Sequence, residues 1–311
     1  MTQRQKGFIC SVLSAVTFGG VACLSPLAFA AGSDPVTLAF LRAFFALPVL
    51  FLMARGAKVS LRVSRRELGQ FALLGALGTG MTALLLNSSY LYIDVGVATT
   101  IHFCYPVFVT VGGVLFYREK VGPVKAAALV IAFLGILLFA AGGGGGANVP
   151  LGALLALASG VTYAFYLLYL EKSGMKNAHP LRVSFFANCF QALLLTVFGV
   201  GLSRFSFFEM RPAAWLIAFV VSMANGILAF YLLQIGVRNT DASTAAILST
   251  FEPLTGMAVG RLLLGEQITA VKLGAGALIL CGVLVLTLWP ERAEKKGVLE
   301  ENPCQTEADM I

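Results

Sequence analysis

The chain has 311 residues, of which 58% are hydrophobic and only 12% are charged. Its mean hydropathy of +0.87 lies far above that of soluble globular domains, which excludes a soluble enzyme or a soluble binding module. The net charge of +7 does not indicate a nucleic-acid partner, because no other feature of the sequence supports one.

Ten apolar stretches of about 20 residues are each long enough to cross the roughly 30 Å hydrocarbon core of a bilayer. Because lipid offers the backbone no hydrogen-bond partners, each stretch is predicted to be helical. The sequence therefore predicts an all-α integral membrane protein with ten transmembrane helices. These predicted spans cover residues 7–31, 35–54, 68–90, 95–116, 123–141, 151–170, 183–202, 213–235, 242–264 and 271–289.

The first stretch also has features of a cleaved secretory signal. Arg4 and Lys6 precede it, and it ends in the small-x-small sequence Ala28-Phe29-Ala30. Its apolar run of about 24 residues is longer than the apolar core of a signal peptide. We therefore expect it to remain as the first transmembrane helix.

The chain reads as one block of five helices written twice. Residues 95–138 align without a gap on residues 242–285, and Pro106 then falls on Pro253 and Gly135 on Gly282. Two blocks that each cross a membrane five times have opposite orientations, which is the usual plan of secondary transporters. We expect a 5+5 inverted repeat around a central cavity. The blocks are residues 1–141 and 151–290, joined by the Gly-rich extracytoplasmic linker 142–150 and followed by a polar, disordered cytoplasmic tail, 291–311.

The basic residues give an orientation. Of the 22 Lys and Arg residues, 17 fall in the loops on one side of the ten predicted spans, 4 fall in the loops on the other side, and Arg42 lies within a span. Basic residues concentrate in cytoplasmic loops. The sequence therefore predicts a multi-pass protein of a bacterial inner membrane with both termini in the cytoplasm.

Polar side chains separate the helices that line a pathway from those that face lipid, because polar groups inside a membrane are costly. The fifth span has no hydrogen-bonding side chain between Ala126 and Ala141, and the tenth has only Cys281 and Thr287 between Leu273 and Trp289, so both are predicted to be peripheral. A single Ser or Thr often bonds to its own helix, yet seven other spans each carry a polar stripe. The predicted substrate-binding residues are Thr17, Asn87, His102, Tyr105, Tyr163, Asn188, Asn225, Ser249 and Glu252.

Three ionisable residues, Arg42, His102 and Glu252, lie well inside spans. A carboxylate at the middle of a membrane helix costs roughly 2.5–3.5 kcal/mol on insertion scales, so Glu252 requires a cation, a water-filled cavity or a proton. It binds either a substrate ammonium or a coupling proton, or it forms a structural ion pair. His102 is either a hydrogen-bonding, proton-linked group or a packing residue, and Arg42 is close enough to its helix end to snorkel.

Pro106 and Pro253 occupy equivalent positions of the two blocks. Each removes a backbone hydrogen bond and frees a carbonyl, that of His102 or of Ser249. Broken helices near the middle of a membrane often hold transporter substrates, so we predict that both prolines are hinges. Simple packing kinks are the alternative.

The sequence Tyr105-Pro106 followed by Glu119-Lys120, with its counterpart Phe251-Glu252-Pro253-Leu254 followed by Leu264-Gly265-Glu266, resembles the EamA-type branch of the drug/metabolite transporter superfamily. The resemblance covers about residues 5–290. It implies a 5+5 inverted repeat, a central cavity, peripheral fifth and tenth helices, and export of small metabolites, amino acids among them, by alternating access.

The leading hypothesis is thus a secondary exporter, and not an enzyme, whose partners are a small-molecule substrate and the lipid bilayer, as a monomer or homodimer. No cofactor or metal site is expected, and coupling to protons stays open. One alternative is a membrane-embedded enzyme with His102 and Glu252 as an acid–base pair. Another is an importer or facilitator of a different solute.

Overall fold

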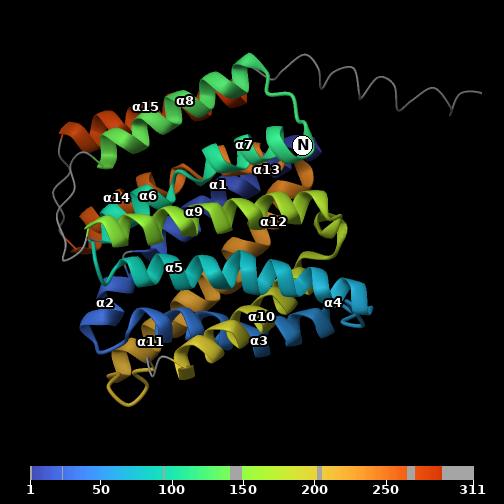
Figure 1. Ribbon diagram of the computed structural model, residues 1–311, viewed down its shortest axis with the longest axis vertical. Coiled ribbons are helices and arrows are strands. Elements are labelled where there is room, and N and C mark those ends of the chain that lie inside the picture. The colour runs from blue at the N-terminus through green and yellow to red at the C-terminus, as the bar shows by residue number, and fades with distance from the viewer. Residues whose placement is uncertain are drawn as a thin grey trace, which may run out of the picture.

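The computed structural model describes residues 2–22, 24–93, 95–140, 149–201, 205–264 and 270–288, and the regular structure within these ranges is entirely helical. The helices run side by side in one bundle (Figure 1). The tail and most of the linker predicted from the sequence lie outside the described residues.

The helices form ten passes within the described ranges, which confirms the ten-helix prediction. Seven helical stretches, some of them with internal breaks, are long and apolar enough to cross a membrane, and two shorter apolar ones cover Pro123–Leu138 and Leu273–Val285. The remaining pass is the broken one formed by residues 242–264. The first five passes are α1 (Gln3–Ala22) with α2 (Leu24–Ala30), α3 (Pro35–Gly56), α4 (Arg65–Ala72) with η1 (Leu73–Gly80) and α5 (Met81–Ser89), α6 (Val95–His102) with α7 (Tyr105–Tyr117), and α8 (Pro123–Ala140). The second five are α9 (Val149–Lys172), α10 (Pro180–Gly201), α11 (Pro212–Val221) with η3 (Ser222–Ala229) and α12 (Phe230–Asn239), α13 (Ala242–Leu248) with α14 (Phe251–Leu264), and α15 (Ala270–Leu288), with the short helix η2 (Met175–Asn177) between α9 and α10.

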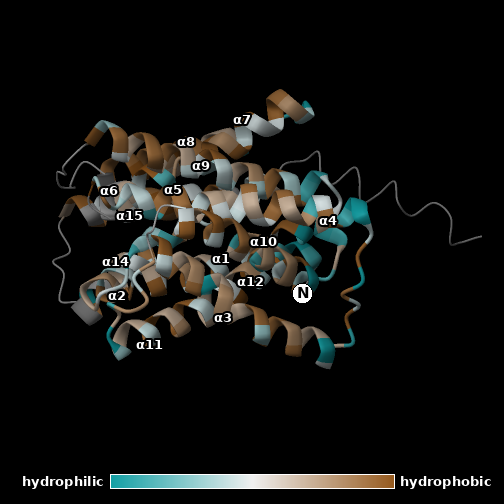
Figure 2. Ribbon diagram, turned by 60° about the horizontal axis from the view of Figure 1, so that its bottom comes forward, coloured by the Kyte–Doolittle hydropathy of each residue, from teal (hydrophilic) through white to brown (hydrophobic). Residues whose placement is uncertain are grey.

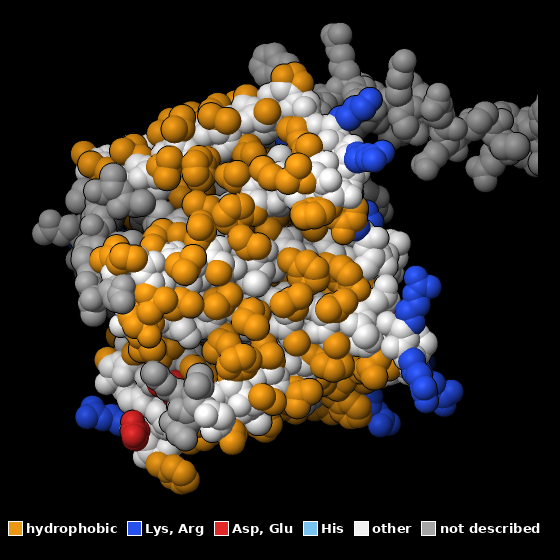
Figure 3. Space-filling view, in the orientation of Figure 1, with side chains coloured by type: hydrophobic (Ala, Val, Ile, Leu, Met, Phe, Trp, Pro, Cys, Tyr) orange, Lys and Arg blue, Asp and Glu red, His pale blue; other side chains and the backbone are white. Residues whose placement is uncertain are grey.

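The bundle has two ends of different character. Lys and Arg side chains gather at one end of the face seen in Figure 3, the end where the N-terminus lies in Figure 1. Figure 2 shows that the ribbons are apolar along most of their length. We call the end that holds the N-terminus and the first residues of α4 the basic end, and the other the opposite end. α3 begins at the opposite end, where Asp34 accepts hydrogen bonds from the amides of Val36 (2.8 Å) and Thr37 (3.0 Å).

The fourth pass of each repeat is broken at the position that the prolines predict. α6 ends at His102 and α7 begins at Tyr105, just before Pro106. In the second repeat α13 ends at Leu248 and α14 begins at Phe251, two residues before Pro253. Because proline has no amide hydrogen, the regular hydrogen-bond ladder cannot continue through it. Each break therefore follows from local sequence.

The third pass of each repeat contains a feature that the sequence did not predict. Both η1 and η3 are π-helical, so the backbone is wider than an α-helix over eight residues in equivalent parts of the two repeats. Side chains satisfy some of the displaced backbone groups. Thr79 donates to the carbonyl of Gly75 (3.1 Å), and the amide of Asn188 on α10 donates to the carbonyl of Gly226 (3.2 Å). π-Helical turns often occur at functional sites.

The last helix of each repeat packs against its counterpart at one edge of the bundle (Figure 1). Gly135 on α8 and Gly282 on α15, which are equivalent in the repeat, both lie at this crossing. A Cβ atom on Gly135 would lie 2.8 Å from Ile279, and one on Gly282 would lie 2.9 Å from the carbonyl oxygen of Ala128. Small residues thus allow the two backbones to approach closely.

Candidate functional site

A cavity lies between the two repeats, on the side of the broken helices that faces the opposite end. A water-sized sphere can be centred in about 130 Å³ of it. A space of this size is well above the minimum needed to hold a water molecule, so the cavity accommodates several waters or a small solute. Its lining comes from both repeats: Phe18, Ala22, Ser25, Arg42, Thr79, Thr82, Ala83, Leu86, Asn87, Tyr90, Thr99, His102, Tyr163, Asn225, Phe230 and Glu252.

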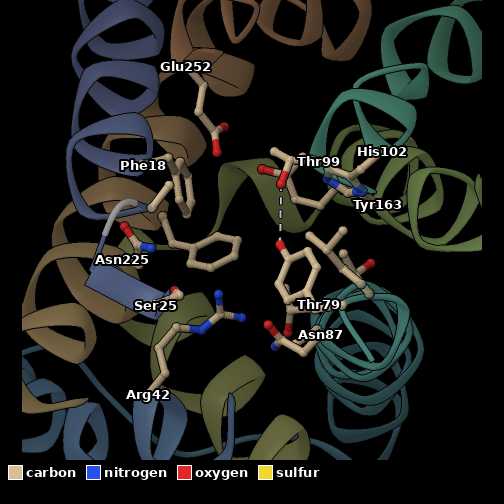
Figure 4. A pocket seen from close by; sticks show the side chains of 16 residues that line it. Phe18, Ser25, Arg42, Thr79, Asn87, Thr99, His102, Tyr163, Asn225 and Glu252 are labelled. Carbon is tan, nitrogen blue, oxygen red and sulfur yellow. Dashed lines mark hydrogen bonds between the residues drawn. The ribbon is translucent and has the colours of Figure 1, made fainter. Parts of the chain in front are cut away.

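Two groups of opposite charge face each other across this cavity. Figure 4 shows the Arg42 guanidinium, from α3 of the first repeat, and the Glu252 carboxylate, from α14 of the second, both pointing inward from opposite walls. Both side chains are half-buried. Within the described part of the chain, neither charged group has a hydrogen-bond or ion-pair partner. The cavity is therefore positive on one wall and negative on the other.

Polar groups between these two charges are partly satisfied. The hydroxyls of Tyr90 and Thr99 are 3.4 Å apart (dashed in Figure 4), and Nδ1 of His102 lies 2.8 Å from Oγ of Ser159. Asn225 lines the cavity and is only 8% exposed, and its side-chain carbonyl oxygen is buried with no hydrogen-bond partner among the described residues. Leaving a buried polar atom unsatisfied costs about 1–3 kcal/mol, so Asn225 is poised to bind a ligand donor or water.

An aromatic floor closes the cavity on its deeper side, and it consists of the rings of Phe18, Tyr105, Tyr163, Tyr166 and Phe230. Tyr163 packs edge-on against Tyr105 with ring centroids 4.8 Å apart, and it stacks on Tyr166 at 5.8 Å. Tyr166 in turn meets Phe230 edge-on at 5.7 Å, and Phe230 meets Phe18 at 5.2 Å. These aromatic contacts link α7 and α9 to α12 and α1. They supply an apolar surface beside the charged walls.

The structure brings together five of the nine predicted substrate-binding residues: the cavity lining includes Asn87, His102, Tyr163, Asn225 and Glu252. These five come from α5, α6, α9, η3 and α14, so the predicted set draws on both repeats.

The other four predicted residues lie outside the lining. Tyr105 is only 1% exposed and lies behind Tyr163. Thr17 and Ser249 donate to the carbonyls of Leu13 and Ala245 in their own helices, at 2.8 and 2.9 Å. Such bonds within a helix are the common alternative for a hydroxyl in a membrane helix.

The polar stripe of α10 also does not face the cavity. Asn188 donates to the carbonyls of Ser184 (2.8 Å) and Gly226, and Gln234 of α12 donates to the Ser184 hydroxyl at 2.9 Å. These side chains join α10 to η3 and α12 instead. The α10 stripe is therefore used for packing between helices, and α10 contributes no residue to the cavity lining.

Several lining residues were not among the predicted substrate-binding residues, Arg42 above all. It lies seven residues into α3, about 10 Å from the helix start at 1.5 Å per residue. Thr79 and Thr82 were also missed, because the π-helical turn of η1 changes which side chains share a face. The one available signal was the rarity of an arginine inside an apolar stretch.

At the basic end, polar contacts join the two repeats. Lys125 at the start of α8 lies 2.6 Å from Oδ1 of Asp241, which caps α13 by accepting from the amide of Thr244 (2.9 Å). Burial alone would raise the pKa of Asp241, but Lys125 and Thr244 hold the pKa of this carboxyl below its usual value. Nearby, Thr110 of α7 and Ser243 of α13 share a hydrogen bond of 2.8 Å.

Glu171 and Lys172, at the end of α9, extend these contacts. The Glu171 carboxylate accepts from the amide of Ala242 at 2.8 Å, and Lys172 pairs with both Glu171 and Glu119. The basic end is thus joined across the repeats below the aromatic floor. Within the described residues, no group of three or more His, Cys, Asp or Glu side chains is placed to bind a metal.

Comparison with known proteins agrees with this architecture. The profile of the EamA-like transporter family matches residues 5–141 and again residues 150–288. An uncharacterized transporter of Archaeoglobus fulgidus is 29% identical over 275 residues, which cover 88% of this chain and 93% of that protein. The uncharacterized transporter YvbV of Bacillus subtilis is 28% identical over 233 residues, with 72% and 71% of the two chains covered.

A solved crystal structure superimposes with a TM-score of 0.78 and 19% identity, covering 92% of this chain and 99% of the other, so the two share a fold. The two family matches fall one on each five-helix repeat and together cover most of the chain. The chain belongs to the EamA-like transporter family.

Proposed function

We propose that this membrane transporter is a secondary exporter of small metabolites, amino acids or related compounds among them, and that it works by alternating access. The observation that carries the proposal is the cavity between the repeats, which is lined by charged, polar and aromatic side chains of both. Binding sites at a repeat interface, beside broken helices, are typical of secondary transporters. Family membership makes the protein a transporter and not an enzyme, so the alternative of an acid–base pair formed by His102 and Glu252 falls away.

The moving parts that we propose are the broken and widened helices. Pro106 and Pro253 interrupt the fourth pass of each repeat, and η1 and η3 widen the third pass. These elements contribute Thr79, Asn225 and Glu252 to the cavity wall. A change in their bend therefore moves the binding groups directly.

We propose that the protein lies in a bacterial inner membrane with its basic end facing the cytoplasm, because basic residues concentrate in cytoplasmic loops. In this orientation both repeats span the membrane five times, and the linker around residue 144 lies on the extracytoplasmic side. The polar tail beyond residue 290 then lies in the cytoplasm.

The experiment is counterflow in proteoliposomes that contain the purified protein. Vesicles are loaded with one unlabelled compound of a panel of amino acids, amines, carboxylic acids and sugars, and uptake of the labelled compound is followed with and without a pH gradient. Exchange of at least one compound above protein-free vesicles is the expected result. Stimulation by the gradient indicates proton coupling, and exchange without any effect of the gradient indicates facilitated transport. No exchange of any compound would overturn the proposal.

A further inference from the structure

The cavity is lined by two side chains of opposite charge that do not pair with any other described group of the protein. Within the described residues, the guanidinium of Arg42 and the carboxylate of Glu252 have no hydrogen-bond or ion-pair partner, and the two groups point into the same cavity (Figure 4). A charged side chain inside a membrane helix costs roughly 2.5–3.5 kcal/mol on insertion scales, and transmembrane charges usually pair with one another. Two unpaired charges of opposite sign in one cavity imply a ligand that compensates both.

The two charges lie at different depths. Arg42 is about 10 Å from the start of α3 at the opposite end, whereas Glu252 is 12 residues from the end of α14 and hence about 18 Å from it. In Figure 4 the Asn225 side chain lies between these two groups, and its carbonyl oxygen is buried with no hydrogen-bond partner among the described residues. This oxygen accepts hydrogen bonds only, so it adds to Glu252 as a site for a group that donates. The deeper part of the cavity therefore favours a cationic donor such as an ammonium.

Arg42 provides the complementary group. A guanidinium presents several donors in one plane and binds a carboxylate through two parallel hydrogen bonds. Its own backbone is fixed, because the carbonyl of Arg42 accepts a hydrogen bond from Ser222 of η3 at 2.7 Å. Beside these charges, the rings of Phe18, Tyr163 and Phe230 line the cavity and offer an apolar surface.

We propose that the cavity binds a zwitterion with an apolar side chain, whose carboxylate pairs with Arg42 and whose ammonium pairs with Glu252 and Asn225. This inference rests on the proposed transport function and names the chemistry of its substrate. It assigns Arg42 as a specificity-determining residue, and it requires both charges on one molecule. A simple amine or a simple carboxylic acid leaves one buried charge without a partner.

The test compares each zwitterion with its two singly charged analogues. L-Leucine is compared with 4-methylpentanoate and 3-methylbutylamine, and L-phenylalanine with 3-phenylpropanoate and 2-phenylethylamine. Binding is measured as the thermal shift of the purified full-length protein in detergent, and transport as counterflow in vesicles. For the wild type, a zwitterion should bind at least about tenfold more tightly than either of its analogues, because a hydrogen bond to a charged group contributes about 1.5–3 kcal/mol and 1.4 kcal/mol is tenfold.

The variants should change this selectivity in opposite directions. Glu252→Gln should abolish the preference for the zwitterion over the acid, and Arg42→Gln should abolish its preference over the amine. Arg42→Lys and Glu252→Asp, which keep the charges, should retain part of the preference and show that the fold tolerates changes at these positions. Arg55→Gln on the same helix and Glu209→Gln, both at exposed positions, are the matched controls and should match the wild type.

A loss of charge that merely destabilised the fold would weaken all three compounds equally, and that result would overturn the inference. So would wild-type protein that binds no zwitterion more tightly than its analogues. The two proposals fail separately. Zwitterion binding without exchange in vesicles would contradict the transport function while supporting the zwitterion site. Exchange of other solutes with no preference for a zwitterion would contradict the zwitterion site while supporting the transport function.

Discussion

Gly19 and Gly20 are neighbours on α1, yet the structure predicts opposite effects when each is replaced by alanine. α1 crosses α14 at Gly19, next to Glu252. A Cβ atom on Gly19 would fall on the carbonyl oxygen of Glu252, far inside van der Waals contact, and 2.9 Å from Cβ of Thr255. A Cβ atom on Gly20 would meet nothing within 4 Å.

The magnitudes follow from these contacts. The atom that Gly19→Ala strikes belongs to the backbone, so it cannot rotate away, and α1 and α14 must separate. Overpacking of this kind costs typically 1–3 kcal/mol, and the better helix propensity of alanine offsets up to about 1 kcal/mol of it. With the full offset Gly19→Ala should therefore lose up to about 2 kcal/mol of stability. Gly20→Ala gains only the propensity term and should be slightly more stable than the wild type.

The assay is thermal unfolding of both variants in the same detergent, followed by the intrinsic fluorescence of the protein. Gly19→Ala should melt a few degrees below the wild type and Gly20→Ala at or above it. Because the displaced carbonyl belongs to Glu252, Gly19→Ala should also weaken substrate exchange. Equal melting temperatures for the two variants, or a larger loss in Gly20→Ala, would refute the close crossing of α1 and α14.

Three further predictions test other parts of the structure. In a background without native cysteines, single cysteines at Thr99, Tyr163 or Asn225 should react with a water-soluble maleimide and be protected by substrate, whereas cysteines along α8 and α15 should react poorly; equal labelling would contradict the cavity assignment. Reporter fusions should place both termini in the cytoplasm and a fusion at Gly144 outside, and a cytoplasmic signal from Gly144 would break the inverted repeat. Asp241→Asn keeps an N-cap but removes the ion pair with Lys125, so it should cost on the order of 1 kcal/mol at neutral pH. Because the folded pKa of Asp241 is lowered, its contribution is present above the ordinary Asp value of about 3.9 and is lost as the pH falls through the folded pKa, so the two proteins should converge in acid.

Much of the fold could be predicted from sequence because its determinants are local. The length of an apolar stretch determines whether it can cross the membrane. Pro106 and Pro253 break their helices regardless of how those helices pack in the bundle. The glycines of the α8 and α15 crossing, Gly135 and Gly282, were visible as equivalent residues of the repeat. The partner that each would meet was not visible.

The candidate site was less predictable, since it depends on which way each helix turns. Thr17, Thr79 and Thr82 each donate to a carbonyl of their own helix, yet only Thr79 and Thr82 line the cavity. The π-helical turns shift the faces of the third and eighth passes, and no composition signal announces them. The sequence shows Arg42 as a charge inside an apolar stretch, but its position opposite Glu252 depends on how the helices pack in the bundle.

The two ends of the structure bear on the direction of transport. The cavity with Arg42 and Glu252 lies on the side of the aromatic floor that faces the opposite end, while Lys125 and Asp241 join the repeats at the basic end. A substrate in this cavity therefore has a shorter route to the opposite end, and the ion pair must part before the basic end can open. With the basic end in the cytoplasm, we infer that this is the state from which an exporter releases its substrate. The inverted repeat then requires a second state in which the opposite end is the closed one.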